Sequence, residues 1–595
     1  MRTLRTLLAT SLTVALAFAG LAAAAPASAD PPPQPFSVQN GTFYHYVRES
    51  GTPFSSITGS IQSGWYSSRG ASDIRIYCPY ESTGEFRGVP ATDYFTTNAS
   101  TGSVADFETM VDTAHAAGMT VTMYVSLILV DPSMDEFVLA QQQRAAGQST
   151  ATTQLFRWAD DDAGATPEFG GWEWSDVAQE YYATSFGYPA LDFANQVTRD
   201  YAKGVLTFWL DRGVDGFEYD APQASWGLTD ADAADIMVDT PNAHGGTAKW
   251  LTAESSIANF DDPYSDSIGL THTLFNGDDD LGSFAYDVMD GTRSADDLES
   301  HFATYLDPRR ASGRGMNAAA SYDLSRSASQ RALDAAVTAG NGVLYSTDVE
   351  QVYSQLSDAS RAAYDEVFRA IDSSSALAPD ASRERVPTGA DPQSYATLRT
   401  SADGSESVLA VYNFRDVAAT ISASLTGLDV TVPQTPTNLV TGQAAPQIAS
   451  SSYAVSLPAY GYVFLDVERG AGTQPWTTVE DTAAGWTYQG YSPLADPGAS
   501  GGASHVSESQ GAYGQLTVAG SELQIVGWRG PDGGTLELFV DGVSRGTAQQ
   551  QSPTETFSAV LFSVSALSPG DHLVRLQQVS PTGAGWTQID VVRSR

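Results

Sequence analysis

The sequence predicts an α/β fold, a (β/α)8 TIM barrel, followed by a β-sandwich domain and a second all-β module. Residues 30–372 alternate short apolar strands with helical patterns, which is the rhythm of a parallel sheet. Residues 373–468 contain only short strand patterns, as expected for a compact sandwich. Residues 476–595 are rich in glycine and lack helical periodicity, and residues 469–475 (RGAGTQP) predict a linker.

The strands and helices of the first region are recognisable one by one. Apolar strand patterns occur in SDIRIYCPY (72–80), MTVTMYVSLIL (119–129) and GVDGFEYDAP (213–222). Amphipathic helix patterns precede the last two, at 104–118 and 196–213, and each ends at a glycine, the usual helix stop.

The first 29 residues have the pattern of a secretory signal peptide. Arg2 and Arg5 give a positive start, an Ala-rich apolar run follows, and residues 27–29 (Ala-Ser-Ala) provide a small-residue cleavage site. A transmembrane helix is the alternative, but the run ends without stop-transfer charges, and no later segment approaches the ~20 apolar residues that a span needs. We therefore expect a secreted, extracellular protein whose fold begins after a Pro-rich leader.

The charge balance limits the classes of partner. The chain has 70 Asp and Glu against 30 Lys and Arg, a net charge of −40, which repels nucleic acid and anionic lipid. We expect neither nucleic acid nor a membrane as partner, whereas a neutral oligo- or polysaccharide is compatible with such a surface. Cys78 is the only cysteine, which excludes an intrachain disulfide, and its apolar strand favours a buried thiol.

Three carboxylates are expected at the ends of barrel strands. Because alternate residues of a strand face opposite sides, Asp220, Glu254 and Asp323 should point into the barrel, where its active sites form. A pair of carboxylates is what glycosidic cleavage requires, one to attack the sugar and one to protonate the leaving oxygen. Acidic residues at strand ends are also common as solvated loop charges, so the spacing alone leaves both interpretations open.

Roughly residues 40–467 resemble the α-amylase family, glycoside hydrolase family thirteen. Residues 91–121 resemble the approach to the family's third strand, residues 190–221, with FWLDRGVDGFEYD, its fourth-strand block, and residues 341–353 its eighth strand. The resemblance places Asp220 on the nucleophile, Glu254 on the general acid/base and Asp323 on the third acid, which binds sugar hydroxyls. It implies a retaining double displacement, ending in hydrolysis or in transfer to another sugar.

The chain departs from this family around the sugar-binding pocket. Glu218 stands where the family has an arginine, two residues before the nucleophile, and the other departures replace polar or aromatic family residues: Val89, Tyr124, Ile128, Leu129 and Tyr322. Such changes favour a rebuilt −1 subsite, since random decay would not spare all three acids. The alternatives are a catalytically inactive barrel that only binds carbohydrate, and an enzyme for a non-glucose sugar with a different linkage.

No cofactor or metal site is predicted for the barrel. Ile128 and Leu129 replace the Asn-His pair near which the family's structural calcium takes oxygen ligands, which weakens the case for that ion. The acidic run at 276–280 (NGDDD) offers carboxylates to a cation, although a solvated loop is the more common state of such a run.

Glu218 needs a partner, because a carboxylate inside a barrel must be paired or protonated. Asp73, Arg75 and Tyr77 share one face of their strand, opposite the apolar face of Ile74 and its neighbours. We therefore expect Arg75 to point inward and to form an ion pair with Glu218.

Aromatic residues that could stack on sugar rings gather between the third and fourth strands and after the nucleophile. Trp172 and Trp226 are the leading candidates, with packing of a long loop as the alternative. The predicted substrate-binding set is Trp226, Trp172, Tyr322, Glu218, Arg75 and Tyr124.

The last region, residues 476–595, resembles jelly-roll, galactose-binding-like modules found on secreted carbohydrate enzymes. The segments that carry this likeness are EDTAAGWTYQGY, LFVDGVSRG and GDHLVRLQQV. The resemblance implies either a carbohydrate-binding module or a structural appendage.

Overall fold

The computed structural model describes most of the chain between residues 41 and 595. The described residues are 41–162, 164–244, 249–254, 270–274, 281–311, 315–320, 324–469, 476–496, 499–500, 503–552, 556–564, 567 and 570–595. The predicted signal peptide, the leader, the acidic run at 276–280 and nearly all of the predicted linker lie outside these residues, as do Tyr322 and Asp323.

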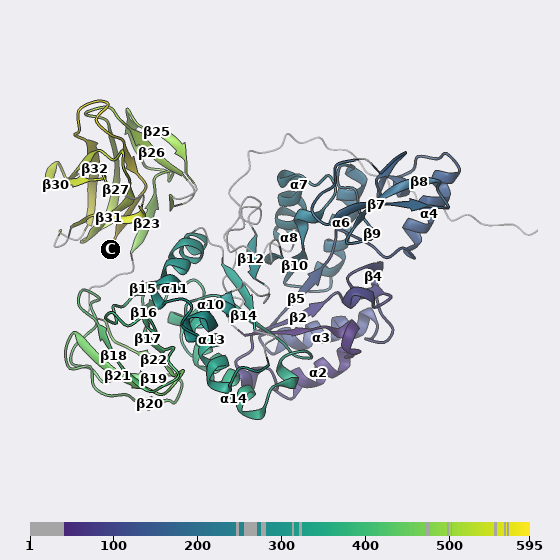
Figure 1. The fold of residues 1–595 in the computed structure, drawn as a ribbon, viewed down its shortest axis with the longest axis horizontal. Helices are drawn as coiled ribbons and strands as arrows, with labels where there is room; N and C mark the ends of the chain where they lie inside the picture. Colours follow the sequence, from purple (N-terminus) through teal and green to yellow (C-terminus); the bar gives the residue numbers. More distant parts are fainter. Residues whose placement is uncertain are drawn as a thin grey trace, which may run out of the picture.

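Eight parallel strands close into a barrel in chain order, which confirms the predicted α/β class (Figure 1). The strands are β1 (Thr42–His45), β2 (Asp73–Tyr77), β5 (Thr120–Val125), β10 (Gly216–Asp220), β11 (Trp250–Glu254), β12 (Thr271–Leu274), β13 (Met316–Ala319) and β14 (Leu344–Asp348). β14 pairs with β1 and completes the cylinder. All their carboxyl ends meet at one face, so residues that end these strands are brought together.

The crossover helices follow the sequence pattern. The main ones are α2 (Phe54–Gln62), α3 (Val104–Ala116), α6 (Gln196–Leu210), α10 (Leu281–Met289), α11 (Ala295–His301), α13 (Ala328–Gly340) and α14 (Asp358–Asp372). In α3, Phe107, Met110, Val111 and Ala114 are buried at the spacing of one helix face. Ser103 caps the helix in a capping box with Asp106, and this satisfies amides that would otherwise lack partners.

A long excursion separates β5 from α6 at the carboxyl-terminal ends of the barrel strands. It contains helices α4 (Asp135–Ala145) and α5 (Ala151–Gln154) and a small antiparallel sheet of β6 (Trp158–Ala159), β7 (Gly170–Ser175), β8 (Glu180–Ser185) and β9 (Tyr188–Pro189). A second small sheet, β3 (Tyr80–Ser82) and β4 (Ala91–Thr97), follows β2.

Two all-β regions follow the barrel, as the sequence predicts. The first has a six-stranded sheet, whose strands in order are β15 (Ser382–Arg385), β16 (Ser394–Thr400), β17 (Ser407–Asn413), β22 (Tyr462–Asp466), β19 (Thr437–Asn438) and β20 (Gln443–Ala444). A two-stranded sheet of β18 (Ala419–Ser424) and β21 (Ser452–Leu457) shares its apolar core. The second has two larger antiparallel sheets. One contains, in order, β23 (Thr477–Glu480), β34 (Val591–Ser594), β28 (Leu523–Arg529) and β31 (Thr556–Val564). The other contains β24 (Thr487–Gln489), β27 (Tyr513–Gly520), β32 (Gly570–Gln578), β29 (Thr535–Val540) and β30 (Val543–Gln549). Arg595 forms an ion pair with Asp429 at 3.0 Å, which joins the end of the chain to the first β region.

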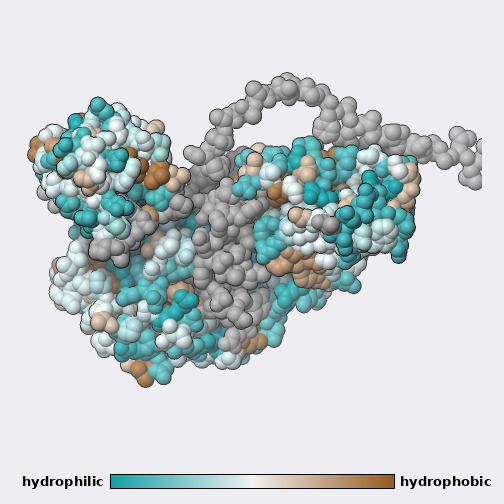
Figure 2. All heavy atoms as spheres, turned by 45° about the horizontal axis from the view of Figure 1, so that its top comes forward, coloured by the Kyte–Doolittle hydropathy of each residue, from teal (hydrophilic) through white to brown (hydrophobic). Residues whose placement is uncertain are grey.

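Hydrophilic residues cover most of the described surface seen in Figure 2, and hydrophobic residues form separate patches. Among the described residues, no helix combines the length and the hydropathy that a membrane crossing needs. Cys78 is fully buried, and burial raises the pKa of its thiol well above the ordinary value, as expected for a packed cysteine rather than a nucleophile.

Candidate active site

Two of the three predicted acids lie side by side at the mouth of the barrel. Asp220 is the last residue of β10 and Glu254 is the last residue of β11, and the two are direct partners in the strand register. Asp220 is buried and Glu254 is partly exposed. The third acid, Asp323, lies outside the described residues.

The alternation of β10 explains why Asp220 faces inward. Phe217 and Tyr219 point away from the barrel axis into the apolar core, and the Tyr219 hydroxyl donates to the Met237 carbonyl at 2.8 Å. Glu218 and Asp220 therefore share the opposite, inward face of the strand. The same rule places Thr252 and Glu254 on the inward face of β11.

The hydroxyl of Tyr124 bridges the two acids. It lies 2.8 Å from Asp220 Oδ1 and also forms a short hydrogen bond with Glu254 Oε2. A phenol has one proton to donate, so it donates to one carboxylate and accepts from the other, which must then be protonated. Asp220, Tyr124 and Glu254 thus form a hydrogen-bonded chain in which one of the two carboxyl groups carries a proton.

Burial and mutual repulsion decide which acid carries that proton. Burial raises the pKa of Asp220, while hydrogen bonds with the side chains of Ser126 and Tyr124 lower it. Burial, followed by the nearby charge of Asp220, raises the pKa of Glu254 well above its ordinary value. These effects favour Glu254 as the protonated member of the pair and Asp220 as the ionised member.

The two carboxylate oxygens of Asp220 have different surroundings. Tyr124 holds Oδ1, whereas Oδ2 is buried without a hydrogen-bond partner in the described part of the chain.

A buried ionic layer lies one step deeper in the barrel, and it contains the predicted ion pair. Arg75 of β2 binds Glu218 of β10, its Nε donates to the Thr122 hydroxyl at 2.9 Å, and it lies 4.0 Å from Asp73. Glu218 and Asp73 are fully buried, and Arg75 is 1% exposed. Arg75 and Glu218 therefore support the site from below and are not placed to touch a sugar, which corrects their expected role in direct substrate contact.

Aromatic residues line the barrel wall next to Tyr124, and sequence reasoning missed them. The Tyr77 ring stacks on Tyr124 with 4.2 Å between centroids, and Tyr46 packs on Tyr77 at 4.4 Å. In TFYHYV, Tyr44 of β1 and Tyr46, just after β1, are two residues apart. This alternation was the sequence feature that could have predicted their inward direction.

The side chain of Arg87 places a positive charge near the mouth of the barrel, which no sequence motif predicted. The Arg87 guanidinium lies 5.0 Å from the Tyr46 ring centre and contacts Glu49 at 3.5 Å. Its charge lowers the pKa of Glu254, against the larger effects of burial and of Asp220.

The prediction that Trp226 lines a sugar subsite is wrong. Trp226 is 1% exposed, and its indole N–H donates to the Thr184 carbonyl at 2.9 Å. The long excursion packs on it, with the half-buried Trp172 edge-on at 5.0 Å, so the ring belongs to the core of that excursion. Trp172 keeps one partly exposed surface, while the third-strand positions Ile128 and Leu129 are buried and offer no polar side chain.

The chain is similar to known proteins over part of its length. Residues 75–271 match the model of the alpha amylase catalytic domain. The oligo-1,6-glucosidase of Bacillus sp. (strain F5) is 29% identical over 185 residues, which cover 29% of this chain and 36% of that protein. The alpha-glucosidase of Pediococcus pentosaceus is 27% identical over 150 residues, 24% of this chain and 26% of that protein. The aligned part thus spans about a third or less of these relatives.

Solved structures share the fold over a longer stretch. Eubacterium rectale Amy13B superposes with a TM-score of 0.56 at 14% identity, covering 73% of this chain and 97% of that one. An alpha-amylase from H. orenii gives 0.55 at 16% identity, covering 72% and 100%. Over residues 75–271 this chain is therefore similar to the alpha amylase catalytic domain, and the solved structures share its fold.

Proposed function

We propose that this protein is a retaining glycoside hydrolase or transglycosidase that acts on α-linked glycosidic bonds of an oligo- or polysaccharide. The observation that carries the proposal is the contact of Asp220 and Glu254 with one Tyr124 hydroxyl. Two oxygens bound to the same atom are at most about 5.6 Å apart, twice a typical O–H···O distance. Retaining enzymes hold their carboxyls about 5–5.5 Å apart, whereas inverting enzymes need about 6.5–9.5 Å.

The chemistry follows from the protonation states. Asp220 Oδ2 attacks the anomeric carbon while the Glu254 proton passes to the glycosidic oxygen, so the leaving sugar departs neutral. A glycosyl ester on Asp220 results. Glu254, now ionised, takes a proton from water or from a sugar hydroxyl, which attacks the ester and restores Asp220 with net retention. Water gives hydrolysis, and a sugar hydroxyl gives transglycosylation.

The −1 subsite of this enzyme differs from the usual α-glucosyl pocket. Glu218, which replaces an arginine, is fully buried and paired with Arg75, and the third strand offers Tyr124 to the acids instead of an aspartate. The relatives are named as oligo-1,6-glucosidase and alpha-glucosidase, which supports an α-glucosidic bond as the first substrate to try.

The test is an assay of the full chain without residues 1–29, beside its Asp220→Asn variant, on a panel of α-glucans, α-glucosides, sucrose-type sugars and polysaccharides with other α-linked units. We expect the wild type alone to release product, with the anomeric configuration retained when followed by NMR. Inverted product would refute the retaining mechanism. Binding of the panel without cleavage by either protein would support the non-catalytic, carbohydrate-binding alternative.

We also propose that the chain is secreted and that its last region binds carbohydrate. The first proposal rests on the signal-peptide pattern of residues 1–29. The second rests on an open groove of about 330 Å³, lined by Gln549, Gln551 and Thr535 among others. The backbone of Trp586, whose side chain is 44% exposed, pairs with Gly533 and Gly534 at the edge of this groove. Amide side chains next to an exposed ring are the usual composition of a sugar site.

A further inference from the structure

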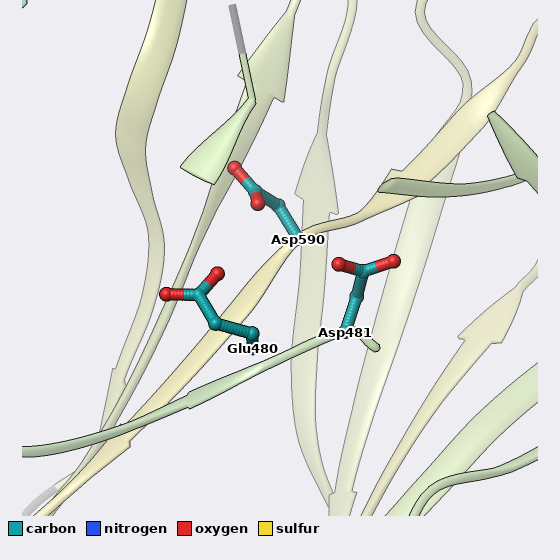
Figure 3. A group of neighbouring side chains, drawn as sticks. All are labelled: Glu480, Asp481 and Asp590. Atoms are coloured by element: carbon teal, nitrogen blue, oxygen red, sulfur yellow. The ribbon is translucent and has the colours of Figure 1, made fainter. Parts of the chain in front are cut away.

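Three acidic side chains gather in the last β region, away from the barrel. Glu480 ends β23, Asp481 follows it, and Asp590 directly precedes β34 (Figure 3). β23 and β34 are antiparallel neighbours, with Glu480 opposite Val591. The cluster therefore ties together the first and the last strand of this region.

The carboxyl groups surround a common space. One oxygen from each lies within 4.8 Å of the others. Asp481 and Asp590 are each 1% exposed, and Glu480 is partly exposed. Glu480 Oε2, Asp481 Oδ1 and Asp590 Oδ1 are all buried without a hydrogen-bond partner in the described part of the chain.

The neighbouring groups do not use these three oxygens. His505 Nδ1 binds Asp481 Oδ2 at 2.6 Å, the Ser500 hydroxyl donates to Glu480 Oε1 at 2.9 Å, and the Ser500 amide donates to Asp590 Oδ2 at 3.3 Å. Each carboxylate is thus oriented through one oxygen, while its other oxygen is bare. Unpaired carboxylate oxygens out of water are costly, because an isolated buried charge must find a counter-charge or a proton.

We propose that Glu480, Asp481 and Asp590 form a structural binding site for a divalent cation, of which Ca²⁺ fits best. Ca²⁺ takes oxygen ligands at about 2.3–2.6 Å, so opposite ligands lie about 4.6–5.2 Å apart, a span that matches the spacing of this cluster. Mg²⁺ needs about 2.0–2.1 Å and a stricter octahedron. The cation replaces the missing donors, and water and backbone carbonyls complete its shell.

Burial of the cluster agrees with a missing counter-charge. Without a cation, desolvation and then the charges of Glu480 and Asp481 raise the pKa of Asp590 to about 8. The alternative to a bound metal ion is therefore a proton on Asp590. A metal site binds added Ca²⁺ and responds to a chelator, whereas a protonated cluster does neither.

The test is a titration of the chelator-treated full chain with Ca²⁺ by calorimetry and with Tb³⁺ by sensitised luminescence. The Trp486 indole donates to the Glu480 carbonyl at 2.8 Å, so this ring is close enough to transfer energy to a bound Tb³⁺. We expect one Tb³⁺ site that Ca²⁺ displaces, and a Ca²⁺-dependent rise in the thermal transition of the last β region.

Variants assign the site. Asp590→Asn should raise the Kd at least about tenfold and abolish the thermal shift, and Glu480→Gln should weaken binding in the same direction. Asp571→Asn, an exposed acid of the same region, is the matched control and should bind as the wild type. If Asp590→Asn does not fold, the partly exposed Glu480 carries the test through Glu480→Gln.

Two results would overturn the proposal. Wild-type affinity and stoichiometry in Asp590→Asn and in Glu480→Gln would place any bound ion elsewhere, for example at 276–280 or at the barrel acids. Absence of Ca²⁺ and Tb³⁺ binding by the wild type would mean that a proton on Asp590 neutralises the cluster.

Discussion

The guanidinium of Arg75, on β2, binds the carboxylate of Glu218, on β10, across the intervening strand β5, and both side chains are buried. Arg75 thereby supplies a positive charge beneath Asp220, the proposed nucleophile, from a different strand than the one on which the α-amylase family carries its arginine. The pair also sets the local electrostatics, since the charge of Glu218 raises the pKa of Glu254.

Breaking this ion pair should destabilise the barrel. Arg75→Met leaves Glu218 buried and unpaired, so we expect a loss of about 3–5 kcal/mol in unfolding free energy. The double variant Arg75→Met/Glu218→Leu removes both charges and should recover most of that loss. Calorimetry of the barrel transition measures both, and a double variant as unstable as Arg75→Met would show that the pair is not the cause.

Glu218→Gln tests the electrostatic link to the acid. Removing the Glu218 charge lowers the pKa of Glu254, because that charge raises it in the wild type. The basic limb of the pH profile of kcat/KM reports loss of the Glu254 proton, so it should move to lower pH. An unchanged basic limb would separate Glu218 from the acid/base.

Tyr124→Phe removes the hydroxyl between the two acids. Tyr124 donates to the ionised Asp220 and lowers its pKa, so loss of the hydroxyl should move the acidic limb of the pH profile to higher pH. We expect kcat to fall about ten- to a hundredfold, because a buried charge-assisted hydrogen bond is worth about 1.5–3 kcal/mol.

The matched control for Tyr124 is Tyr94→Phe. Tyr94 is equally buried, but its hydroxyl donates to the backbone carbonyls of Ser126 and Leu129. The Tyr94→Phe variant should unfold more easily than the wild type but keep the wild-type pH profile of activity. Equal shifts in both variants would reduce Tyr124 to a packing role.

Glu254→Gln should inactivate the enzyme and also stabilise it at neutral pH. Loss of the acid/base costs about 10²–10⁴-fold in rate on an unactivated glycoside. An activated aryl glycoside needs no proton, so it should still form the glycosyl ester, and azide should release it as the α-glycosyl azide. Asp220→Asn should show neither reaction.

The stability effect of Glu254→Gln follows from linkage. A carboxyl whose pKa is raised on folding stabilises the fold at low pH, and this contribution is lost as pH rises from the unfolded pKa, about 4.3, through the folded pKa. Glutamine has no such loss, so the Tm of the variant should exceed that of the wild type by an amount that grows with pH across this window. Glu366→Gln, at an exposed site, should show no such trend.

Trp586→Ala tests carbohydrate binding by the last β region. Loss of an exposed ring beside the groove should weaken retention on an insoluble polysaccharide about tenfold or more, while cleavage of a short oligosaccharide stays unchanged. Leu494→Ala, at a similarly exposed apolar side chain (43%), is the control. Equal retention of both variants and the wild type would leave this region a structural role only.

The sequence by itself determined the class of fold and the direction of the key side chains. Strand alternation in GFEYD places Glu218 and Asp220 on one face, because successive residues of any strand point to opposite sides, and the same rule turned Arg75 inward. An unpaired carboxylate in a barrel needs a counter-charge, so the Arg75–Glu218 pair could be predicted from chemistry alone.

Only the tertiary structure decided what the aromatic residues and the third strand do. Trp226 follows Asp220 closely in sequence. Whether its ring is buried depends on what packs over the ring, and the excursion that contains β7 and β8 covers it. Tyr124 became the link between Asp220 and Glu254 because strands β5, β10 and β11 are neighbours in the closed barrel, far apart as they are in the chain. The acidic cluster of the last region likewise joins residues 480–481 to residue 590 through strand pairing, a proximity that local sequence cannot encode.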